Sequence, residues 1–387
     1  MWNNLRQILQ HPQYRSVALM FGINSLLFTF WVTRIPQIKA ALGLSESELG
    51  LVLFFGPVGG LSAMFVANWL SRRVGEGRLT VYAMLAAVLA APLPVLAPTV
   101  PLLGVSLFAI GFAGAVMNVA MNAVVTLMER RDGSHIMITC HGGWSLGGLL
   151  GSFSTSLLMG ANVAPGWHWL VVAVGLSTWG LLLAWPQLQG IRLEGAAGPA
   201  FVLPTRPVLG LAGVGLCVMI GEGAAADWSG VYLAEVVGAS DYFVGMGYAS
   251  FTLLMTLGRF YGDTLTARLG GLRVVRLGTA LAAVGLGLVL LPTLPTTLLG
   301  FGLMGLGYSC VVPVLFSRSG QVPGLSPAMG IAAVASAGYV GFLGGPVLIG
   351  LLAEHLGLAA GFGLLLLLTG LAFVGAPRAM SWAQEGG

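Results

Sequence analysis

Long apolar segments separated by short polar ones run through the whole of this 387-residue chain. Most of them reach the roughly 20 residues that an α-helix needs to cross about 30 Å of hydrocarbon. Helix is the expected conformation, because an open strand in lipid would leave backbone N–H and C=O groups without partners. The pattern therefore predicts an all-α membrane protein with twelve transmembrane helices, at residues 16–36, 46–70, 79–98, 102–128, 136–160, 167–186, 207–236, 242–265, 274–292, 296–317, 327–353 and 358–377.

A longer polar stretch separates the sixth and seventh apolar segments and divides the chain in two. Its glycines, prolines and charged residues are typical of a loop outside the membrane. We therefore expect an N-terminal six-helix bundle at residues 1–186, a cytoplasmic linker at 187–206 and a C-terminal six-helix bundle at 207–387.

The two halves carry the same short motif at a spacing of 195 residues. Ala67–Gly75 and Gly262–Gly270 both have the order small-x-x-Leu-hydroxyl-x-Arg-x-Gly, and each ends a long apolar segment. A helix-end motif that recurs at half the chain length predicts two copies of one bundle, an arrangement typical of secondary transporters.

Charged residues make up only 8% of the chain, against about a quarter in a soluble domain, and this favours a membrane protein. The net charge of +4 is no sign of a nucleic-acid partner, because the basic residues lie in short loops. Fourteen of the 17 fall on the side that we assign to the cytoplasm, Arg34 and Lys39 fall outside, and Arg259 lies within a helix. This bias predicts a bacterial inner-membrane protein with both termini in the cytoplasm.

The sequence carries no sign of a cofactor or of an enzyme. Cys140, Cys217 and Cys310 all lie inside apolar segments and predict neither a disulfide framework nor a metal site. The sequence has no phosphate-binding loop of the Walker type and no hydrolase motif, which argues against an ATP-driven pump and against a hydrolase.

Twelve spans in two halves, a central linker and the repeated arginine–glycine loop together resemble the major facilitator superfamily. The loop signature of that family is Gly-x-x-x-Asp-Arg-x-Gly-Arg-Arg, and this chain has Ser71 and Thr266 where the aspartate stands. The charge relay that the aspartate makes in the family therefore lacks its acidic residue here. The positions that match the signature are Arg72, Gly75, Arg78, Arg268 and Gly270.

Shorter stretches resemble particular branches of the superfamily. Gly338–Gly350 is similar to the Gly-Pro helix motif of its antiporters, although it lies in span 11 and that motif is characteristic of span 5. Trp31–Pro36 and Glu222–Trp228 resemble a bacterial branch that is distantly similar to fucose-permease-type sugar porters. The family fold implies a central cavity lined by spans 1, 4, 7 and 10, flanked by spans 2, 5, 8 and 11.

Glu222 is the strongest candidate for proton coupling. It lies about fifteen residues into span 7, roughly 21 Å along the helix and just outward of the midplane. An ionisable group at this depth is costly in lipid and is functional by default, and a carboxyl group can bind a proton from one side and release it to the other. The alternative is a structural glutamate that stays protonated or pairs with an arginine.

Arg34 and Asp227 are predicted to form an outer gate. They lie at matching depths, about 27 to 29 Å from the cytoplasmic starts of spans 1 and 7, which occupy equivalent places in the two halves. An ion pair between them would hold the outer side closed and would break on opening. In the alternative, Arg34 extends to the outer headgroups and Asp227 is solvated.

Amide and aromatic side chains are the candidate solute ligands. An amide can both donate to and accept from a hydroxyl-rich molecule, and it can equally bridge two helices. Aromatic faces pack against sugar rings or flat solutes, with plain packing between helices as the alternative. The candidates are Asn24, Asn118 and Asn122, on spans 1 and 4, and Trp144, Tyr308 and Tyr339, on spans 5, 10 and 11.

Three further polar residues are assigned mainly to structure. His141, near the inner end of span 5, is either part of a proton relay or, as we favour, hydrogen-bonded to Asn118 or Asn122 on span 4. Arg259 and Asp263 stand one turn apart on span 8 and are predicted to pair with each other.

Together these residues predict a monomeric secondary transporter that works by alternating access, with a small-molecule substrate, protons and membrane lipids as its partners. Proton-coupled symport of a sugar-like or other polar solute is favoured. One alternative is proton-driven efflux of amphipathic compounds, suggested by the Gly-Pro segment. The other is translocation of a lipid, which would need an apolar cavity with a lateral opening.

Overall fold

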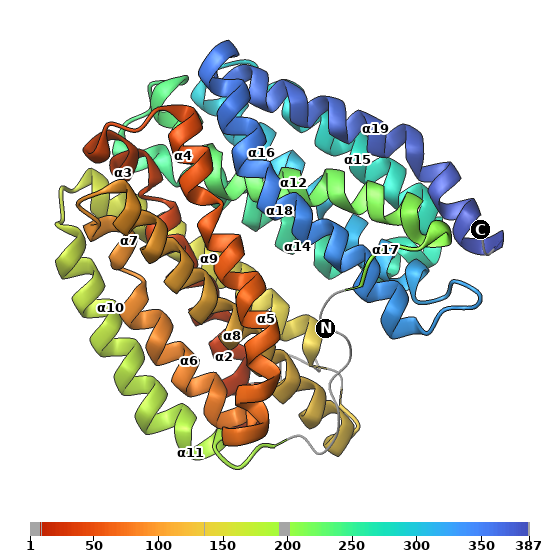
Figure 1. Cartoon of the computed structure of the whole chain (residues 1–387), viewed down its shortest axis with the longest axis horizontal. Coiled ribbons are helices and arrows are strands. Elements are labelled where there is room, and N and C mark those ends of the chain that lie inside the picture. Colours follow the sequence, from red (N-terminus) through yellow and green to blue (C-terminus); the bar gives the residue numbers. More distant parts are fainter. Residues whose placement is uncertain (1–7, 9, 135, 193–201, 386–387) are drawn as a thin grey trace. The chain divides into compact units, whose positions relative to one another are not determined.

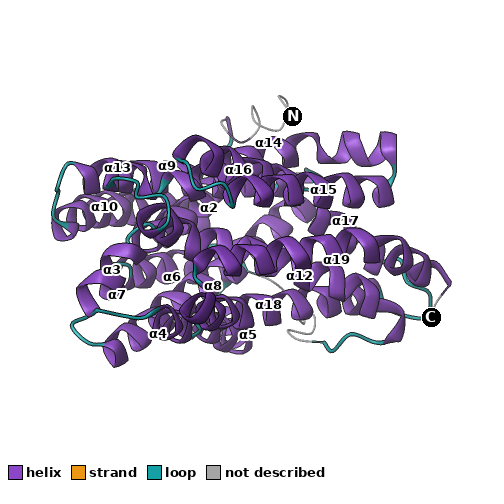
Figure 2. Cartoon of the chain, turned by 90° about the horizontal axis from the view of Figure 1, so that it is seen from above, coloured by secondary structure: helices purple, strands orange, loops and turns teal. Residues whose placement is uncertain are grey.

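The computed structural model describes residues 8, 10–134, 136–192 and 202–385. Over these residues the structure consists of helices and loops, and Figure 2 shows no strand in this part of the chain. Ten helical segments of the described chain are long and apolar enough to cross a membrane. The two other predicted spans are helices of 24 residues each, α9 (Met137–Gly160) and α14 (Met246–Leu269). The predicted all-α membrane fold is confirmed.

The chain divides into two compact units, which are described separately (Figure 1). The first comprises Met1–Gly43 and Phe55–Ala197. Within its described residues its helical segments are α2 (Pro12–Val32), α3 (Ile35–Leu42), α5 (Phe55–Val74), α6 (Glu76–Ala90), α7 (Leu93–Leu96), α8 (Val100–Asp132), α9, α10 (Pro165–Trp179), a π-helical turn at Gly180–Ala184 and α11 (Trp185–Leu188).

The second unit comprises Leu44–Phe54 and Gly198–Gly387. Within its described residues it is built from α4 (Glu46–Leu53), α12 (Arg206–Glu235), α13 (Asp241–Val244), α14, α15 (Gly271–Val289), α16 (Leu294–Tyr308), α17 (Val311–Ser319), α18 (Pro327–Leu356) and α19 (Leu358–Glu385).

The division differs from the predicted boundaries at one segment. Residues 44–54, expected in the N-terminal bundle as the start of span 2, group with the second unit because α4 packs against α18. The predicted linker begins inside α11 and ends where α12 starts at Arg206, and its residues 193–201 lie outside the described residues.

The same helix pairs pack together in both units. In the first unit α2 packs on α9, and both α5 and α6 pack on α8. In the second, α12 packs on α18, and both α14 and α15 pack on α16. Several helices, α12 and α18 among them, have proline in the first turn, where its missing N–H costs no hydrogen bond.

Positive backbone φ angles recur at positions 195 residues apart. Gly75, before α6, has φ 88° and ψ 148°, and Gly270, before α15, has φ 81° and ψ 150°. This conformation is open almost only to glycine, which explains why the loop motif ends in glycine in both halves. Two further pairs have the same spacing, Gly43 with Gly238 and Asn162 with Gly357. The repeat inferred from the loop motif is therefore present in the backbone.

Candidate functional site

Glu222 and Asp227 lie on α12, which packs against α14, α18 and α19 within the second unit (Figure 1). Both side chains are half-buried. The residues 195 positions earlier, on α2, are Leu27 and Val32, and both are buried. The two carboxyl groups therefore occur in the second half only, whereas the loop glycines occur in both halves. Features shared by both halves build the fold, so these two groups are candidates for a task that only one half performs.

Tyr308 is brought next to Glu222 by the glycine that precedes it. A Cβ atom placed on Gly221 would lie 2.7 Å from the Tyr308 hydroxyl oxygen, so only glycine leaves room for the ring. The Tyr308 side chain is buried, and its hydroxyl group makes a 2.6 Å hydrogen bond with that of Thr369 on α19. The hydrogen bond to Thr369 thus holds the Tyr308 ring against Gly221, the residue before Glu222.

Tyr248 and Arg259 on α14 complete these surroundings. The positive charge of Arg259 acts on Glu222, and the charges of Glu222, Asp227 and Arg259 all act on Tyr248. Tyr248 and Arg259 are eleven residues apart, close to three helical turns, so they lie on one face of α14. We call Glu222, Asp227, Tyr248, Arg259 and Tyr308 the α12 carboxyl cluster.

The pairing predicted for Arg259 lies partly outside the described residues, because the Asp263 side chain is not among them. The interaction of Arg259 with Glu222 was not anticipated from the sequence. The spacing of Tyr248 and Arg259 places them on one face of α14, but it does not identify Glu222 as their neighbour.

The amides predicted as solute ligands lie in the first unit and bond to protein groups. Asn24 on α2 donates to the Gly114 carbonyl group on α8 at 3.0 Å and accepts from Trp144 Nε1 on α9 at 3.4 Å. Asn122 donates to the backbone and side-chain oxygens of Asn118, one turn earlier on α8, at 2.8 and 3.2 Å. Asn24 thus links α2, α8 and α9. Such bridging of helices is the alternative to solute binding that the sequence allowed. The amides and Trp144 stay half-buried and keep part of their surface accessible.

Arg34 follows the end of α2 and is only 1% exposed. Its Nη1 donates to Gln37 Oε1 at 3.0 Å, and its guanidinium group lies 5.8 Å from the centre of the Phe30 ring. His168 on α10 lies near the same phenylalanine, with 4.9 Å between the ring centres of His168 and Phe30, and the Arg34 charge acts on it. Asp227 belongs to the other unit, so the gate between Arg34 and Asp227 stays a prediction.

His168 was not among the sequence candidates. His141 on α9 lies edge-on to Phe21 with 5.0 Å between ring centres, and its predicted bond to a span 4 amide stays a prediction. Tyr339 is half-buried on α18.

The beginning of the linker holds the inner-loop signature of the first unit. The Gly77 N–H donates to the Ile191 carbonyl group at 3.1 Å, and Arg192 Nη2 donates to the Arg72 carbonyl group at 2.5 Å. Arg73 lies over the Trp69 ring at 4.3 Å. The loop that lacks the acidic residue of the family signature is therefore fixed by backbone and arginine contacts instead.

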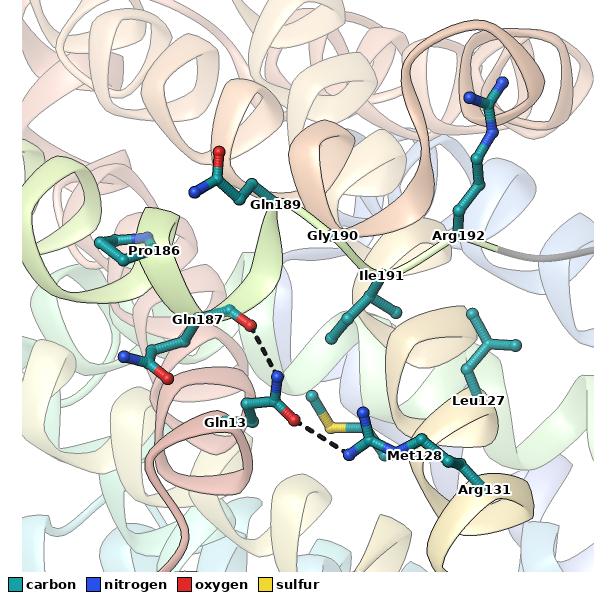
Figure 3. A pocket seen from close by; sticks show the side chains of 10 residues that line it. All are labelled: Gln13, Leu127, Met128, Arg131, Pro186, Gln187, Gln189, Gly190, Ile191 and Arg192. Atoms are coloured by element: carbon teal, nitrogen blue, oxygen red, sulfur yellow. Dashed lines mark hydrogen bonds between the residues drawn. The ribbon is translucent and has the colours of Figure 1, made fainter.

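A cavity of about 470 Å³ lies beside this contact (Figure 3). Gln13 donates to the Gln187 carbonyl group at 3.1 Å and accepts from Arg131 Nη2 at 2.9 Å across it. Arg131 also forms an ion pair with Asp132. The polar groups here bind one another and tie α2, α8 and α11 together. The lining residues are Gln13, Leu127, Met128, Arg131, Pro186, Gln187, Gln189, Gly190, Ile191 and Arg192.

Comparisons with known proteins agree with this architecture. Residues 17–200 match the family described as the Major Facilitator Superfamily. The chain is 33% identical over 345 residues to an uncharacterized transporter, y4wD, of Sinorhizobium fredii, covering 88% of this chain and 91% of the relative. It is 32% identical over 357 residues to an uncharacterized MFS-type transporter of Yersinia pestis, covering 92% and 93%.

Solved structures show the same fold at low sequence identity. The crystal structure of a mutant of the nucleoside transporter NupG superposes with a TM-score of 0.72 at 14% identity. The superposition covers 96% of this chain and 100% of that one.

Proposed function

Because the chain belongs to the major facilitator superfamily, we propose that it moves a small polar organic solute across the bacterial inner membrane by alternating access, coupled to protons. It is a multi-pass membrane transporter and not an enzyme. The finer assignments that we propose are the solute class, the coupling ion, symport as the direction, the cytoplasmic termini and the monomeric state.

The α12 carboxyl cluster carries the proposal for proton coupling. Coupling requires a group that binds a proton while it faces one side and releases it while it faces the other. Glu222 is a half-buried carboxyl group in a membrane-spanning helix, and its repeat-related residue is Leu27. The positive charge of Arg259 stabilises the carboxylate once the proton has left, so both protonation states have an environment that tolerates them.

The half-buried amides and aromatics support a polar, hydroxyl-bearing solute. Asn24 and Trp144 already hold each other in place, so their accessible edges are presented in a fixed geometry. A sugar-like molecule offers both hydroxyl groups for the amides and an apolar ring face for the indole. We therefore favour symport of such a solute.

Export of an amphipathic compound is the second candidate. Pro346 lies inside α18 next to Gly345, and the segment around them is similar to the Gly-Pro motif of the antiporters. Lipid translocation is the third, and we rank it below the other two because the accessible groups named above are polar.

The experiment that tests the solute class is thermal stabilisation of the purified protein. A ligand that binds only the folded state raises the melting temperature. We expect stabilisation by members of a panel of sugars, sugar alcohols and nucleosides, and none by amphipathic cations or phospholipids. Stabilisation by the amphipathic compounds alone would replace symport with the export proposal. A stabilising solute is then used in exchange and uptake assays with proteoliposomes.

The proposed outer gate predicts a specific energetic coupling. Because Arg34 is buried, removing either Arg34 or Asp227 leaves the other charge poorly compensated when the outer side closes, and each single change is expected to favour the outward-open state by about 1–3 kcal/mol. Exchanging the charges, with Arg34→Asp and Asp227→Arg together, is expected to recover part of the loss.

The measurement is the rate at which an impermeant thiol reagent labels a cysteine placed at Leu49, which is 1% exposed, in a chain whose three native cysteines are replaced. The four proteins form a double-mutant cycle. Additive effects of the two single substitutions would show that Arg34 and Asp227 do not form a gate.

A further inference from the structure

The direction of the hydrogen bond between Tyr308 and Thr369 follows from the partners of the threonine. Thr369 on α19 donates its only hydroxyl proton to the Leu365 carbonyl oxygen at 2.7 Å, because a carbonyl group can only accept. In the 2.6 Å bond between the two hydroxyl groups, Thr369 is therefore the acceptor and Tyr308 the donor. The hydroxyl proton of Tyr308 thus points toward α19.

The oxygen of the same hydroxyl group lies against α12. A Cβ atom on Gly221 would lie 2.7 Å from this oxygen, which places it beside the helix backbone one residue before Glu222. The charge of Glu222 acts on Tyr308. Tyr308 and Thr369 are 1% and 0% exposed, so little water reaches the pair to weaken the dipole of the O–H bond.

A hydroxyl oxygen whose proton is turned away treats the two forms of a carboxyl group differently. It can accept a hydrogen bond from the protonated form, whereas it has no proton to donate to the carboxylate. The negative end of its dipole also disfavours a negative charge nearby. The positive charge of Arg259 has the opposite effect on Glu222, because it favours the carboxylate.

The other ionisable groups near Glu222 come from α12, α14 and α18. Asp227 lies five residues further along α12, about 140° around the helix. Tyr248 on α14 lies within range of the Glu222 charge. Tyr339 lies in the stretch of α18 that packs against Gly223. These three groups are neutral or negatively charged, so within the α12 carboxyl cluster the guanidinium group alone is positive.

The hydroxyl pair belongs to the second half of the chain only, as Glu222 does. The residues 195 positions before Glu222, Arg259, Tyr308 and Thr369 are all apolar, namely Leu27, Met64, Ala113 and Val174. The architecture shared by the two halves therefore does not require this hydrogen bond. Its occurrence together with the carboxyl group connects it to the task of that group.

We infer that Thr369 is a positioning residue for the proton of Glu222: by accepting from Tyr308, it turns the hydroxyl proton away from α12 and so favours the protonated carboxyl group. A Tyr308 hydroxyl group released from Thr369 turns and donates to the carboxylate instead. The inference rests on the proposed coupling role of Glu222. It adds two residues, on α16 and α19, that set how readily this carboxyl group gives up its proton.

The test measures the protonation of Glu222 by its reaction with dicyclohexylcarbodiimide in the purified protein over a series of pH values. This apolar reagent adds to protonated carboxyl groups, and mass spectrometry of peptides separates the products at Glu222 and Asp227. We call the pH of half-maximal labelling at Glu222 the labelling midpoint. Thr369→Val keeps the shape of the side chain and removes the acceptor, so the buried Tyr308 hydroxyl group turns toward α12. The labelling midpoint is expected to fall by about one pH unit, because the carboxylate gains a donor.

Variants of Tyr308 show whether the threonine acts through the tyrosine. Tyr308→Phe removes the oxygen beside α12 and adds no donor, so it is expected to lower the labelling midpoint by less than Thr369→Val does. Combining Thr369→Val with Tyr308→Phe is expected to give the labelling midpoint of Tyr308→Phe alone. Thr369→Ser keeps the acceptor and is expected to keep the parent labelling midpoint.

Thr279→Val is the matched control for the loss of a buried threonine. Thr279 on α15 is fully buried and donates to the Val275 carbonyl oxygen, one turn earlier, at 2.8 Å. This variant is expected to keep the parent labelling midpoint. Labelling at Asp227 is expected to match the parent in the Thr369 variants, and Glu222→Gln is expected to give no product at position 222.

A parent labelling midpoint in Tyr308→Phe would by itself overturn the inference, also where Thr369→Val fails to fold. An undiminished effect of Thr369→Val in the Tyr308→Phe protein would overturn it as well, because the threonine would then act by packing. The readout uses neither solute nor a proton gradient, whereas the coupling role of Glu222 is tested by transport. The two proposals can therefore fail separately.

Discussion

Replacing Glu222 with glutamine is expected to abolish accumulation of solute in response to a pH gradient, while exchange of solute across the membrane continues. Glutamine has nearly the size and the hydrogen-bonding groups of a protonated glutamate, but it cannot release a proton. The variant therefore stays in the state that a protonated carrier occupies. Exchange needs no net release of the proton, whereas accumulation needs one release in every cycle.

The measurement uses proteoliposomes and the solute found by thermal stabilisation. Uptake driven by an imposed pH gradient is expected to fall to the level of protein-free liposomes, and counterflow is expected to stay within about threefold of the parent. Glu235→Gln is the matched control, because Glu235 ends the same helix α12 and is exposed. Gradient-driven accumulation by the Glu222→Gln protein would exclude Glu222 as the coupling residue.

The α12 carboxyl cluster explains why Glu222 and not Asp227 is proposed for this role. The positive charge of Arg259 acts on Glu222 and would favour its carboxylate once the proton has left. Burial acts on both carboxyl groups, and the Arg259 charge acts on Glu222 in addition. The two carboxyl groups of α12 thus differ in their surroundings, and this difference supports separate tasks.

The helices and the repeat could be predicted from the sequence because both depend on local information. Twenty apolar residues in a row leave no other membrane structure, and the glycine at the end of each loop motif specifies a backbone angle at that residue. Gly75 and Gly270 show this directly, since their φ angles agree within about 10°.

The side-chain partners could not be predicted, because they depend on how each helix is rotated about its axis and where it crosses its neighbours. The spacing within α14 predicts a pair of Arg259 with Asp263, which stays a prediction, but it gives no sign that the Arg259 charge also acts on Glu222, on another helix. Asn24 is linked to Gly114 and Trp144, which are 90 and 120 residues away in the chain. The grouping of α4 with α18 likewise depends on a contact between glycines far apart in the chain.

Glycine crossings of this kind hold the first unit together as well, and they lead to the prediction with the largest effect on stability. Gly143, Gly147 and Gly151 follow one another at intervals of four residues on α9 and face α2. A Cβ atom on Gly147 would lie 2.7 Å from the Gly22 Cα and closer still to the Gly22 carbonyl oxygen. In a membrane the packing of helices depends on this close approach, because lipid is as apolar as the side chains.

Gly147→Ala is therefore expected to lower the free energy of unfolding by about 1–3 kcal/mol, because α2 and α9 must move apart along their length. Gly147→Leu is expected to yield no folded protein. The control is Gly175→Ala on α10, where a Cβ atom meets nothing within 4 Å, and alanine favours helix over glycine by about 1 kcal/mol. This control is expected to match or exceed the parent.

The measurement is the melting temperature of each purified protein in the same detergent, followed by fluorescence size-exclusion chromatography. We expect the order Gly175→Ala, parent, Gly147→Ala, from the most to the least stable. Equal melting temperatures for the two alanine variants would show that α2 and α9 tolerate separation, and the close crossing would then contribute nothing to the stability of the first unit. A lower melting temperature for Gly147→Ala alone would show that the close α2–α9 crossing stabilises the first unit. The same crossing brings Asn24 on α2 and Trp144 on α9 to hydrogen-bonding distance.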